Sequence, residues 1–363
     1  MTNELQTAPE IDFDKLSPEV RRDIRKLCTL NNYRAPLGVL FDYAVIAFSI
    51  WLCVGVSYWF YPVSLVLIGS TYRALAHLQH DSAHKILARN HTWNLLLGTV
   101  FSGYLIFHLF TPYRNSHIGG HHRFLGDAEK DPDYAFHLEC GLYDHRQPTK
   151  RFLARNVLLS VLGLRAPEYV RYIVRDRLMF RSANATVSSP ISMRAELAIL
   201  AAQWIAVFAV CALLGQLHLL LLFWFVPMFT TAVAIGWLCE LAEHFPLPES
   251  ESKRILLTRN RHGWWIERFL FGRHNENLHA VHHVSAGVPY WNAKKAHAVM
   301  MRDEAYARWS GMWAGIFTRT RAERGKETLV SYATTYREWR RRGGDPARLE
   351  RSFAESMTLS RSH

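Results

Sequence analysis

The chain has little of what would make it a disulfide-bonded protein or a carrier of its own redox cofactors. Its 363 residues include only five cysteines, and none of them form a Cys-x-x-Cys pair. There is no glycine-rich dinucleotide fingerprint and no His-Pro-Gly-Gly haem-binding sequence. These absences exclude a built-in dinucleotide-binding domain, an iron–sulfur cluster and a fused haem domain. We expect the cysteines to be small core residues in a reducing compartment.

Long apolar runs, in contrast, are present and unevenly placed. Hydrophobic residues make up 49% of the chain and concentrate in residues 37–79, 93–111 and 197–239. One helix needs about 20 apolar residues to cross a bilayer, so the first run predicts a hairpin of two spans that turns near Ser57–Pro62. The last run predicts a second hairpin that turns near Gly215–His218. We therefore expect an all-helical integral membrane protein with four transmembrane helices in two hairpins.

The distribution of positive charge predicts the orientation in the membrane. Neither expected outer turn contains a lysine or an arginine, although the net charge of the chain is +12. The positive-inside rule therefore places both termini, and the site described below, on the cytoplasmic side. Nucleic acid is not an expected partner, because the basic residues flank apolar spans and no recognition motif appears. A basic cytoplasmic face suits an anionic lipid surface or an acidic electron-carrier protein.

Three regions are expected along the chain. Residues 1–36 form a cytoplasmic N-terminal segment, in which residues 17–28 predict an amphipathic helix on the membrane surface. Its polar start shows no signal peptide, so insertion would depend on the first spanning helix. Residues 37–295 form the membrane domain with its cytoplasmic cap, and residues 296–363 form a soluble, helical C-terminal region. Within the membrane domain, residues 151–181 interleave leucine, valine and tyrosine with arginine and predict one or two amphipathic surface helices.

Eight of the 19 histidines fall into three short motifs. HDSAH contains His80 and His84, HIGGHH contains His117, His121 and His122, and HAVHH contains His279, His282 and His283. Because positions i and i+4 share a helix face, we expect His117 to pair with His121, while His122 turns to a second ion. Neutral imidazole binds iron, zinc and copper, and eight ligands are too many for one ion. The motifs predict a cap that holds two metal ions.

Residues 93–111 lie between the first two motifs and are long enough to span the bilayer. A crossing would place His80 and His84 on the opposite side of the membrane from His117. A shared metal site forbids that separation. We therefore expect this segment to be a re-entrant or interfacial helix.

With these motifs the sequence resembles the membrane-bound fatty acid desaturase and hydroxylase superfamily, whose members carry boxes of the forms HxxxH, HxxxHH or HxxHH, and HxxHH. The resemblance covers roughly residues 37–295. It implies a non-haem centre of two iron ions on the cytoplasmic side, with a further ligand on the last spanning helix, where His244 in LCELAEHF fits. It also implies O₂ as co-substrate and a separate electron donor of the ferredoxin, rubredoxin or cytochrome type.

Five polar residues near the histidines are candidates to orient them by hydrogen bonds: Glu240, Asp81, Asn275, Glu276 and Asp131. Glu240 lies one helical turn before His244, and we favour it as a hydrogen-bond partner of that imidazole over a direct ligand. Asn275 and Glu276 precede the third motif and are expected to support it. Asp131 belongs to the acidic run GDAEKDPDY, which predicts either a solvated turn or carboxylates that orient the imidazoles.

Two classes of function remain open. The first is an oxygen-dependent oxidoreductase acting on unactivated C–H bonds, and the second is a metal-binding or transport protein. A transporter should hold its ligands near the bilayer midplane, whereas these histidines follow the helix ends. The sequence HAVHHVSAGVPYWN resembles the desaturase ending, so we favour desaturation of a fatty acyl chain or related amphiphile over hydroxylation of a lipid or small specialised metabolite. Nitrogen ligands favour iron over magnesium or calcium, but zinc suits imidazole equally well.

Overall fold

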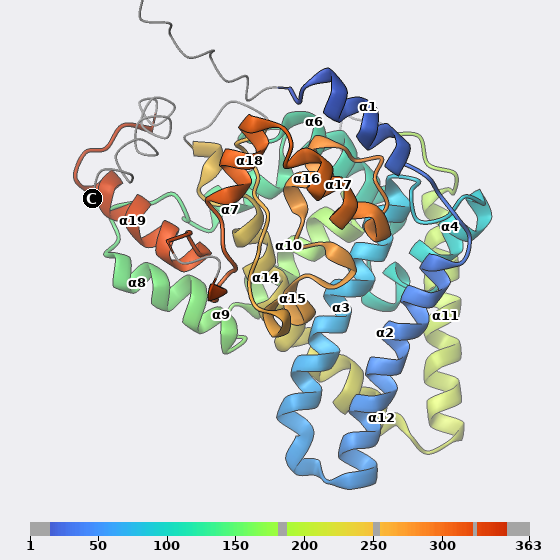
Figure 1. Ribbon diagram of the computed structural model, residues 1–363. Coiled ribbons are helices and arrows are strands. Elements are labelled where there is room, and N and C mark those ends of the chain that lie inside the picture. Colours follow the sequence, from blue (N-terminus) through green and yellow to red (C-terminus); the bar gives the residue numbers. More distant parts are fainter. Residues whose placement is uncertain (1–14, 181–186, 250–254, 322–324, 347–363) are drawn as a thin grey trace, which may run out of the picture.

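The computed structural model describes residues 15–180, 187–249, 255–321 and 325–346. Among these residues the elements are helices, and the β-type pairing is one isolated bridge between Trp313 and Glu327. The all-helical class is therefore confirmed for the described part of the chain. Figure 1 shows a cap of mostly short helices above a stalk of long ones. The expected terminal regions extend into residues 1–14 and 347–363, which lie outside the described residues.

The first half of the stalk is a helical hairpin. α2 (Arg34–Trp51) continues through a π-helical turn as far as Val56, and the chain reverses at Ser57. The Ser57 hydroxyl accepts a hydrogen bond from the backbone of Trp59 at 3.3 Å, which caps the next turn. α3 (Tyr61–Ala83) then runs back beside α2. The reversal lies where the apolar pattern predicts it.

The second half of the stalk is built in the same way, with a kinked return helix. α11 (Met193–Leu213) ends just before Gly215, whose φ of +67° suits a residue without a Cβ. The chain returns through α12 (Leu217–Leu220), a π-helical turn, α13 (Val226–Phe229) and α14 (Thr231–His244). Pro227 is the second residue of α13 and follows directly on the π-helical turn Leu221–Phe225.

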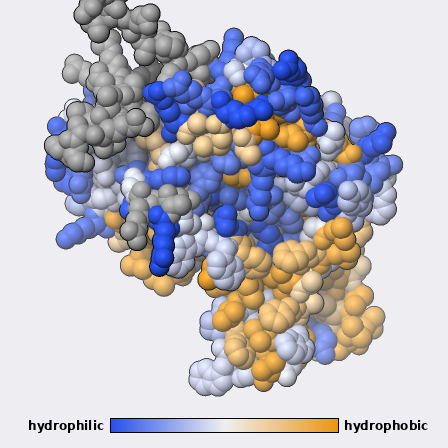
Figure 2. All heavy atoms as spheres, in the orientation of Figure 1, coloured by the Kyte–Doolittle hydropathy of each residue, from blue (hydrophilic) through white to orange (hydrophobic). Residues whose placement is uncertain are grey.

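Among the described residues, three helical stretches are long and apolar enough to cross a membrane: Arg34–Val56, Met193–Leu213 and Leu217–Glu249. Figure 2 shows apolar side chains covering the stalk. α3 is not one of these three, and it packs between α2 and α14 with polar side chains such as Gln79 buried along it. The described part of the chain thus has three candidate spans, or four if a bent pair of helices counts as one. The arrangement of four spans in two hairpins stays a prediction.

The segment between the first two histidine motifs is this bent pair. α4 (His91–Gly98) leads to a 3₁₀ turn at Gly103–Ile106, and the next helical stretch, Phe110–Phe124, is bent by 99° from it. Such a bend is typical of a broken span or a re-entrant loop. The segment leaves His84 and comes back to His117, and these two rings lie 5.3 Å apart. It therefore starts and ends at one place, as a re-entrant helix requires.

The cap contains the remaining helices and covers one end of the stalk (Figure 1). α1 begins after Ser17, whose hydroxyl accepts from the backbone of Val20 at 3.5 Å, as the amphipathic pattern predicts. Its buried residues Val20 and Ile24 pack against α17 in a core centred on Tyr306 and Trp309. The cap helices are α1 (Pro18–Leu27), α5 (Phe110–Arg114), α6 (His122–Phe124), α7 (Pro132–Glu139), α8 (Thr149–Leu153), α9 (Leu159–Val161), α10 (Ala166–Ile173), α15 (Trp265–Phe271), α16 (His279–Val284), α17 (Ala293–Met300), α18 (Glu304–Gly311) and α19 (Leu329–Arg341).

Close contact between α3 and α14 sets the positions of both helix ends that enter the cap. A Cβ added at Gly69 on α3 would lie 2.7 Å from the Thr231 Cβ and 2.8 Å from the Ala232 backbone nitrogen. Tyr72, one turn further along, donates its hydroxyl to the carbonyl of Trp224 at 2.8 Å. The absence of a side chain at Gly69 therefore allows the two helices to touch.

We expect Gly69→Ala to lower the free energy of unfolding by about 1–3 kcal/mol, because overpacking against a helix backbone forces the helices apart. Thermal unfolding of the detergent-solubilised protein measures the loss. Gly311→Ala is the matched control, since its Cβ would meet nothing within 4 Å. Equal melting temperatures for the two variants would contradict the close packing of α3 on α14.

Candidate metal centre

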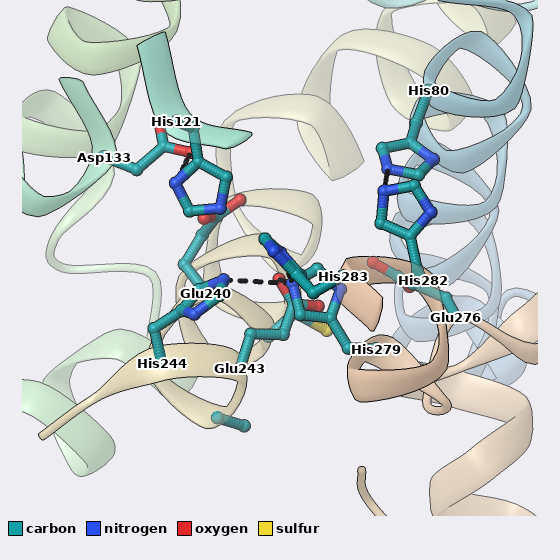
Figure 3. Close-up of polar contacts among 12 residues, drawn as sticks. His80, His121, Asp133, Glu240, Glu243, His244, Glu276, His279, His282 and His283 are labelled. Atoms are coloured by element: carbon teal, nitrogen blue, oxygen red, sulfur yellow. Dashed lines mark hydrogen bonds and ion pairs between the residues drawn. The ribbon is translucent and has the colours of Figure 1, made fainter. Parts of the chain in front are cut away.

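The three histidine motifs and His244 lie on four chain segments that converge inside the cap. The first motif ends α3, with His84 as its C-cap residue. The second occupies a π-helical turn, Asn115–His121, and the first residue of α6. The third forms most of α16, and His244 is the last residue of α14. Figure 3 shows side chains from these elements pointing toward one another.

The nine predicted histidines divide into two groups, and within each group the nitrogen atoms lie within 4.8 Å of one another. The larger group is His80, His84, His117, His122 and His282. The smaller group is His121, His244, His279 and His283, and all four of its members are buried. Each group contains histidines from at least three chain segments, so neither could form from one motif alone.

The distances within each group fit nitrogen ligands that share a metal ion. In the larger group, Nε2 of His282 lies 2.9 Å from Nε2 of both His80 and His122. In the smaller group, Nε2 of His279 lies 3.0 Å from Nε2 of both His244 and His283. Two nitrogens bound at right angles about 2.1 Å from one ion lie about 3.0 Å apart. The residues present therefore fit a metal ion in each group.

An unpartnered buried atom supports the same interpretation. Nε2 of His84 is buried and has no hydrogen-bond partner among the described residues. Buried polar atoms are rarely left without a partner. The ring of His84 lies 4.6 Å from the ring of His282 and 4.8 Å from the ring of His122, so this nitrogen belongs to the larger group.

The pairing expected for the second motif is wrong, because the backbone there is not an ordinary α-helix. His117 groups with His122, whereas His121 joins the smaller group. The backbone N–H of His122 donates to the carbonyl of His117, five residues earlier, in a π-helical turn. This repeat places positions i and i+5 on one face, and Nε2 of His117 and His122 lie 3.0 Å apart. The π-helical turn thus assigns the adjacent residues His121 and His122 to different groups.

Hydrogen bonds to Nδ1 hold several rings so that Nε2 faces the group. Nδ1 of His80 lies 3.1 Å from Asp81, and Nδ1 of His121 lies 3.0 Å from Asp131. Nδ1 of His244 lies 3.0 Å from the carbonyl oxygen of Leu257. An acceptor on one ring nitrogen fixes the tautomer that presents the other nitrogen as a ligand.

The acidic run after the second motif combines a turn at the surface with carboxylates that contact an imidazole. Asp131 and Asp133 are buried, and their carboxylates lie 3.0 and 3.5 Å from Nδ1 of His121. Asp127 and Glu129 instead form a solvent-exposed turn, in which Asp127 accepts from the backbone of Glu129 at 3.0 Å. Only the second half of the run contacts the histidines.

Three of the candidate orienting residues have other partners. Glu240 accepts from Arg73 at 3.0 Å rather than from His244, whose Nδ1 is already occupied by Leu257. Glu276 also accepts from Arg73. Asn275 donates its side-chain amide to the carbonyl of Tyr290 at 2.9 Å and so supports the loop after α16. The prediction that Glu240 orients His244 is therefore wrong.

Burial keeps the third motif in its metal-binding form. It lowers the pKa of His279, His282 and His283 well below the usual value, and neighbouring imidazoles lower these pKa values further. The three rings are therefore neutral at physiological pH. Neutral imidazole is the form that offers a lone pair to a metal.

A cavity of about 410 Å³ reaches both histidine groups. One part of its wall is apolar and comes from the 3₁₀ turn before α5, from the end of the α10 segment and from α13; it includes Ile106, Phe107, Ile173, Met228 and Phe229. The other part carries histidines of both groups and a set of charged side chains. The cavity size is within the range of small-molecule sites, and its contents would contact the metal centre directly.

Comparison with known proteins identifies the family. The fatty acid desaturase family matches residues 14–315. The chain belongs to this family. A curated relative, dihydrorhizobitoxine desaturase of Bradyrhizobium elkanii, is 37% identical over 328 residues, which are 90% of this chain and 91% of the relative. The predicted family is confirmed, and the protein is a desaturase-type oxidoreductase with candidate membrane helices.

One functional feature of this desaturase was missed from the sequence. Arg73 lies inside the first apolar run, and it contacts Glu240, Glu243 and Glu276 at the cavity wall. A charged residue in an apolar run is a functional-site hypothesis by default, so the position of Arg73 in the sequence was the signal. Its three partners come from α14 and from the loop before α16, which sequence spacing does not bring together.

We expect Asp131→Asn to weaken metal binding by about 10–100-fold, because the amide holds the His121 ring less firmly and in a less basic state. Titration of the metal-free protein with Fe²⁺ in the absence of oxygen measures this affinity. Asp127→Asn, in the exposed half of the same run, should bind like the unchanged protein. A similar loss in both variants would show that the acidic run acts through its overall charge alone.

Proposed function

We propose that this desaturase holds two iron ions, one at each histidine group, and uses O₂ to introduce a double bond into an amphiphilic substrate. The division of nine imidazoles into groups of five and four carries this proposal. Iron bound in nitrogen-rich sites supplies the activation of O₂ needed to remove two hydrogens from an unactivated carbon chain. All nine predicted histidines serve as ligands in this proposal: His80, His84, His117, His121, His122, His244, His279, His282 and His283.

The protein's own residues prepare the site for this chemistry. Asp81, Asp131 and the carbonyl of Leu257 fix ring orientation, as their distances to Nδ1 support. Burial keeps bulk water away from most of the imidazoles, and the apolar wall of the cavity lies beside them. A substrate held against that wall presents a fixed pair of carbons to both groups. Positioning of this kind decides between loss of a second hydrogen and formation of an alcohol.

The arrangement in the membrane belongs to the same proposal. Four helices cross the bilayer, with both termini and the metal centre on the cytoplasmic side, as the positive charges predict. Residues 37–295 then form the membrane domain that holds the site, flanked by the N-terminal segment and the C-terminal helical region. Electrons come from a separate ferredoxin, rubredoxin or cytochrome that docks on the basic cap.

The substrate is a fatty acyl chain or a related amphiphile. The relative from Bradyrhizobium elkanii is named for dihydrorhizobitoxine rather than for a fatty acid. Its 37% identity over 90% of this chain supports a small specialised metabolite as the second candidate. Hydroxylation is the alternative outcome of the same C–H cleavage, and metal transport is the alternative of another class.

We expect the purified protein to contain about two iron atoms per chain and to consume O₂ only with substrate and an electron donor, because each histidine group offers enough ligands for one ion. His84→Ala and His283→Ala each remove a ligand from a different group and should lower the iron content and abolish turnover. His218→Ala, an exposed residue at the stalk turn, is the control. Metal analysis, O₂ uptake and mass spectrometry of products give the readouts.

The same measurements separate the alternatives. A product lacking two hydrogens supports desaturation, whereas a product with one added oxygen supports hydroxylation. Tightly bound zinc, or iron without O₂ consumption for any amphiphile tested, would overturn the proposed reaction. Full iron content in both ligand variants would contradict the assignment of the two groups.

A further inference from the structure

The wall of the desaturase cavity carries charged side chains that the proposed reaction does not use. Arg73, Glu240, Glu243 and Glu276 line the cavity, and Arg261 pairs with two of these carboxylates from outside it. We call these five residues the charged network. They come from α3, from α14 and from the two loops that flank α15, and Figure 3 shows the three glutamates among histidines of both groups.

The donors of Arg73 are already paired within the network. Its Nη1 donates to Glu240 at 3.0 Å, its Nη2 donates to Glu243 at 2.9 Å, and its Nε donates to Glu276. Arg261 donates to Glu243 at 3.1 Å and to the carbonyl of Phe271 at 2.9 Å. The guanidinium of Arg73 therefore has little capacity left for an anionic ligand.

The carboxylates of the network, in contrast to Arg73, have oxygen atoms that can still accept a hydrogen bond. Oε2 of Glu276 is buried without a hydrogen-bond partner among the described residues, and Nη2 of Arg261 lies 3.9 Å from it. Glu276 is 5% exposed and lines the cavity. Glu240 contributes only Oε1 to its bond with Arg73, which leaves its second oxygen available at the same wall. The network contains three carboxyl groups and two guanidinium groups, so its acceptor oxygens are not all used by the two arginines.

Carboxylates other than Glu240 and Glu276 are better placed to balance the positive charge of the metal ions. Asp81, Asp131 and Asp133 accompany the imidazoles directly. Glu243 is the member of the network nearest to a histidine, with Oε2 at 3.7 Å from Nε2 of His279. Glu240 and Glu276 face the cavity instead. A hydrocarbon end placed against them would leave their oxygens unpaired, which costs free energy in a buried site.

We propose that the substrate of this desaturase carries an ammonium group that binds at Glu240 and Glu276, while its carbon chain lies along the apolar wall. The substrate class is an aliphatic amine or amino-acid-like amphiphile rather than a neutral acyl chain. Glu240 lies four residues before His244 on α14, about 6 Å along the helix axis. When the ammonium group of the substrate is bound at these glutamates, the carbons a few bonds along its chain lie beside the histidines. This inference rests on the proposed function, because it names the substrate of the same site.

Binding of three matched probes tests the proposal without turnover. The iron-loaded, detergent-solubilised protein is titrated calorimetrically with hexylamine, 1-hexanol and hexanoate at neutral pH. A hydrogen bond to a charged group contributes about 1.5–3 kcal/mol, so we expect hexylamine to bind at least about tenfold more tightly than 1-hexanol. Hexanoate should bind most weakly, because the free acceptors of the network repel it.

Two variants assign the preference to the network. Glu240→Gln keeps the shape of the side chain but removes its charge, and it should abolish the preference for the amine over the alcohol. Glu304→Gln removes a carboxylate from the exposed face of α18 and should leave the preference unchanged. Iron content and thermal unfolding of each sample identify a variant that has lost its fold, and Glu276→Gln then replaces it in the comparison.

The outcomes separate this inference from the proposed function. Equal binding of amine and alcohol to the unchanged protein would overturn the inference, as would an amine preference that survives Glu240→Gln in a folded sample. Either result would leave the iron content and O₂ consumption untouched as tests of the reaction. An amine preference in a protein that holds zinc would overturn the proposed reaction and support the binding site.

Discussion

The meeting of nine imidazoles from four chain segments is the constraint on which the rest of this structure depends. Within each group the nitrogens lie within 4.8 Å of one another, so the elements that carry them have little freedom. α3 and α14 must end side by side, which their contact at Gly69 allows. The segment after α4 must bend back to where it started, and α16 must bring His282 to His80 on α3 and His279 to His244 on α14. The positions of these elements in the fold follow from this one requirement.

The centre also explains why so much polarity is buried at the junction of cap and stalk. Carboxylates hold imidazoles, and guanidinium groups pair with other carboxylates around a cavity whose opposite wall is apolar. Such buried pairs are weak evidence for stability, since desolvation offsets much of their attraction. Their position beside the histidines points to a role in binding and positioning. One site thus combines an apolar surface for a carbon chain with acceptors for a polar group.

Much of the fold and of the candidate metal centre could be predicted from the sequence, because histidine motifs and apolar runs are local patterns. Motif spacing identified eight of the converging histidines, the family resemblance implied the ninth, His244, and apolar runs located both chain reversals. The π-helical turn at Asn115–His121 could not be predicted, since i, i+4 spacing looks the same in either helix type, and it reverses the roles of His121 and His122. Glu240 had a plausible local partner in His244, but it pairs instead with Arg73 from another helix. Long-range ion pairs of this kind depend on packing, which spacing along one chain segment does not encode.

Mössbauer spectroscopy of the purified protein, loaded with isotopically enriched ferrous iron, tests the central claim most directly. One group offers five imidazoles and the other offers four, so the two ions should have different surroundings. The account predicts two ferrous quadrupole doublets of equal area, and His283→Ala should remove or shift one while leaving the other in place. A single iron species at full loading, or loss of both doublets in a variant that keeps its fold, would contradict two separate histidine sites.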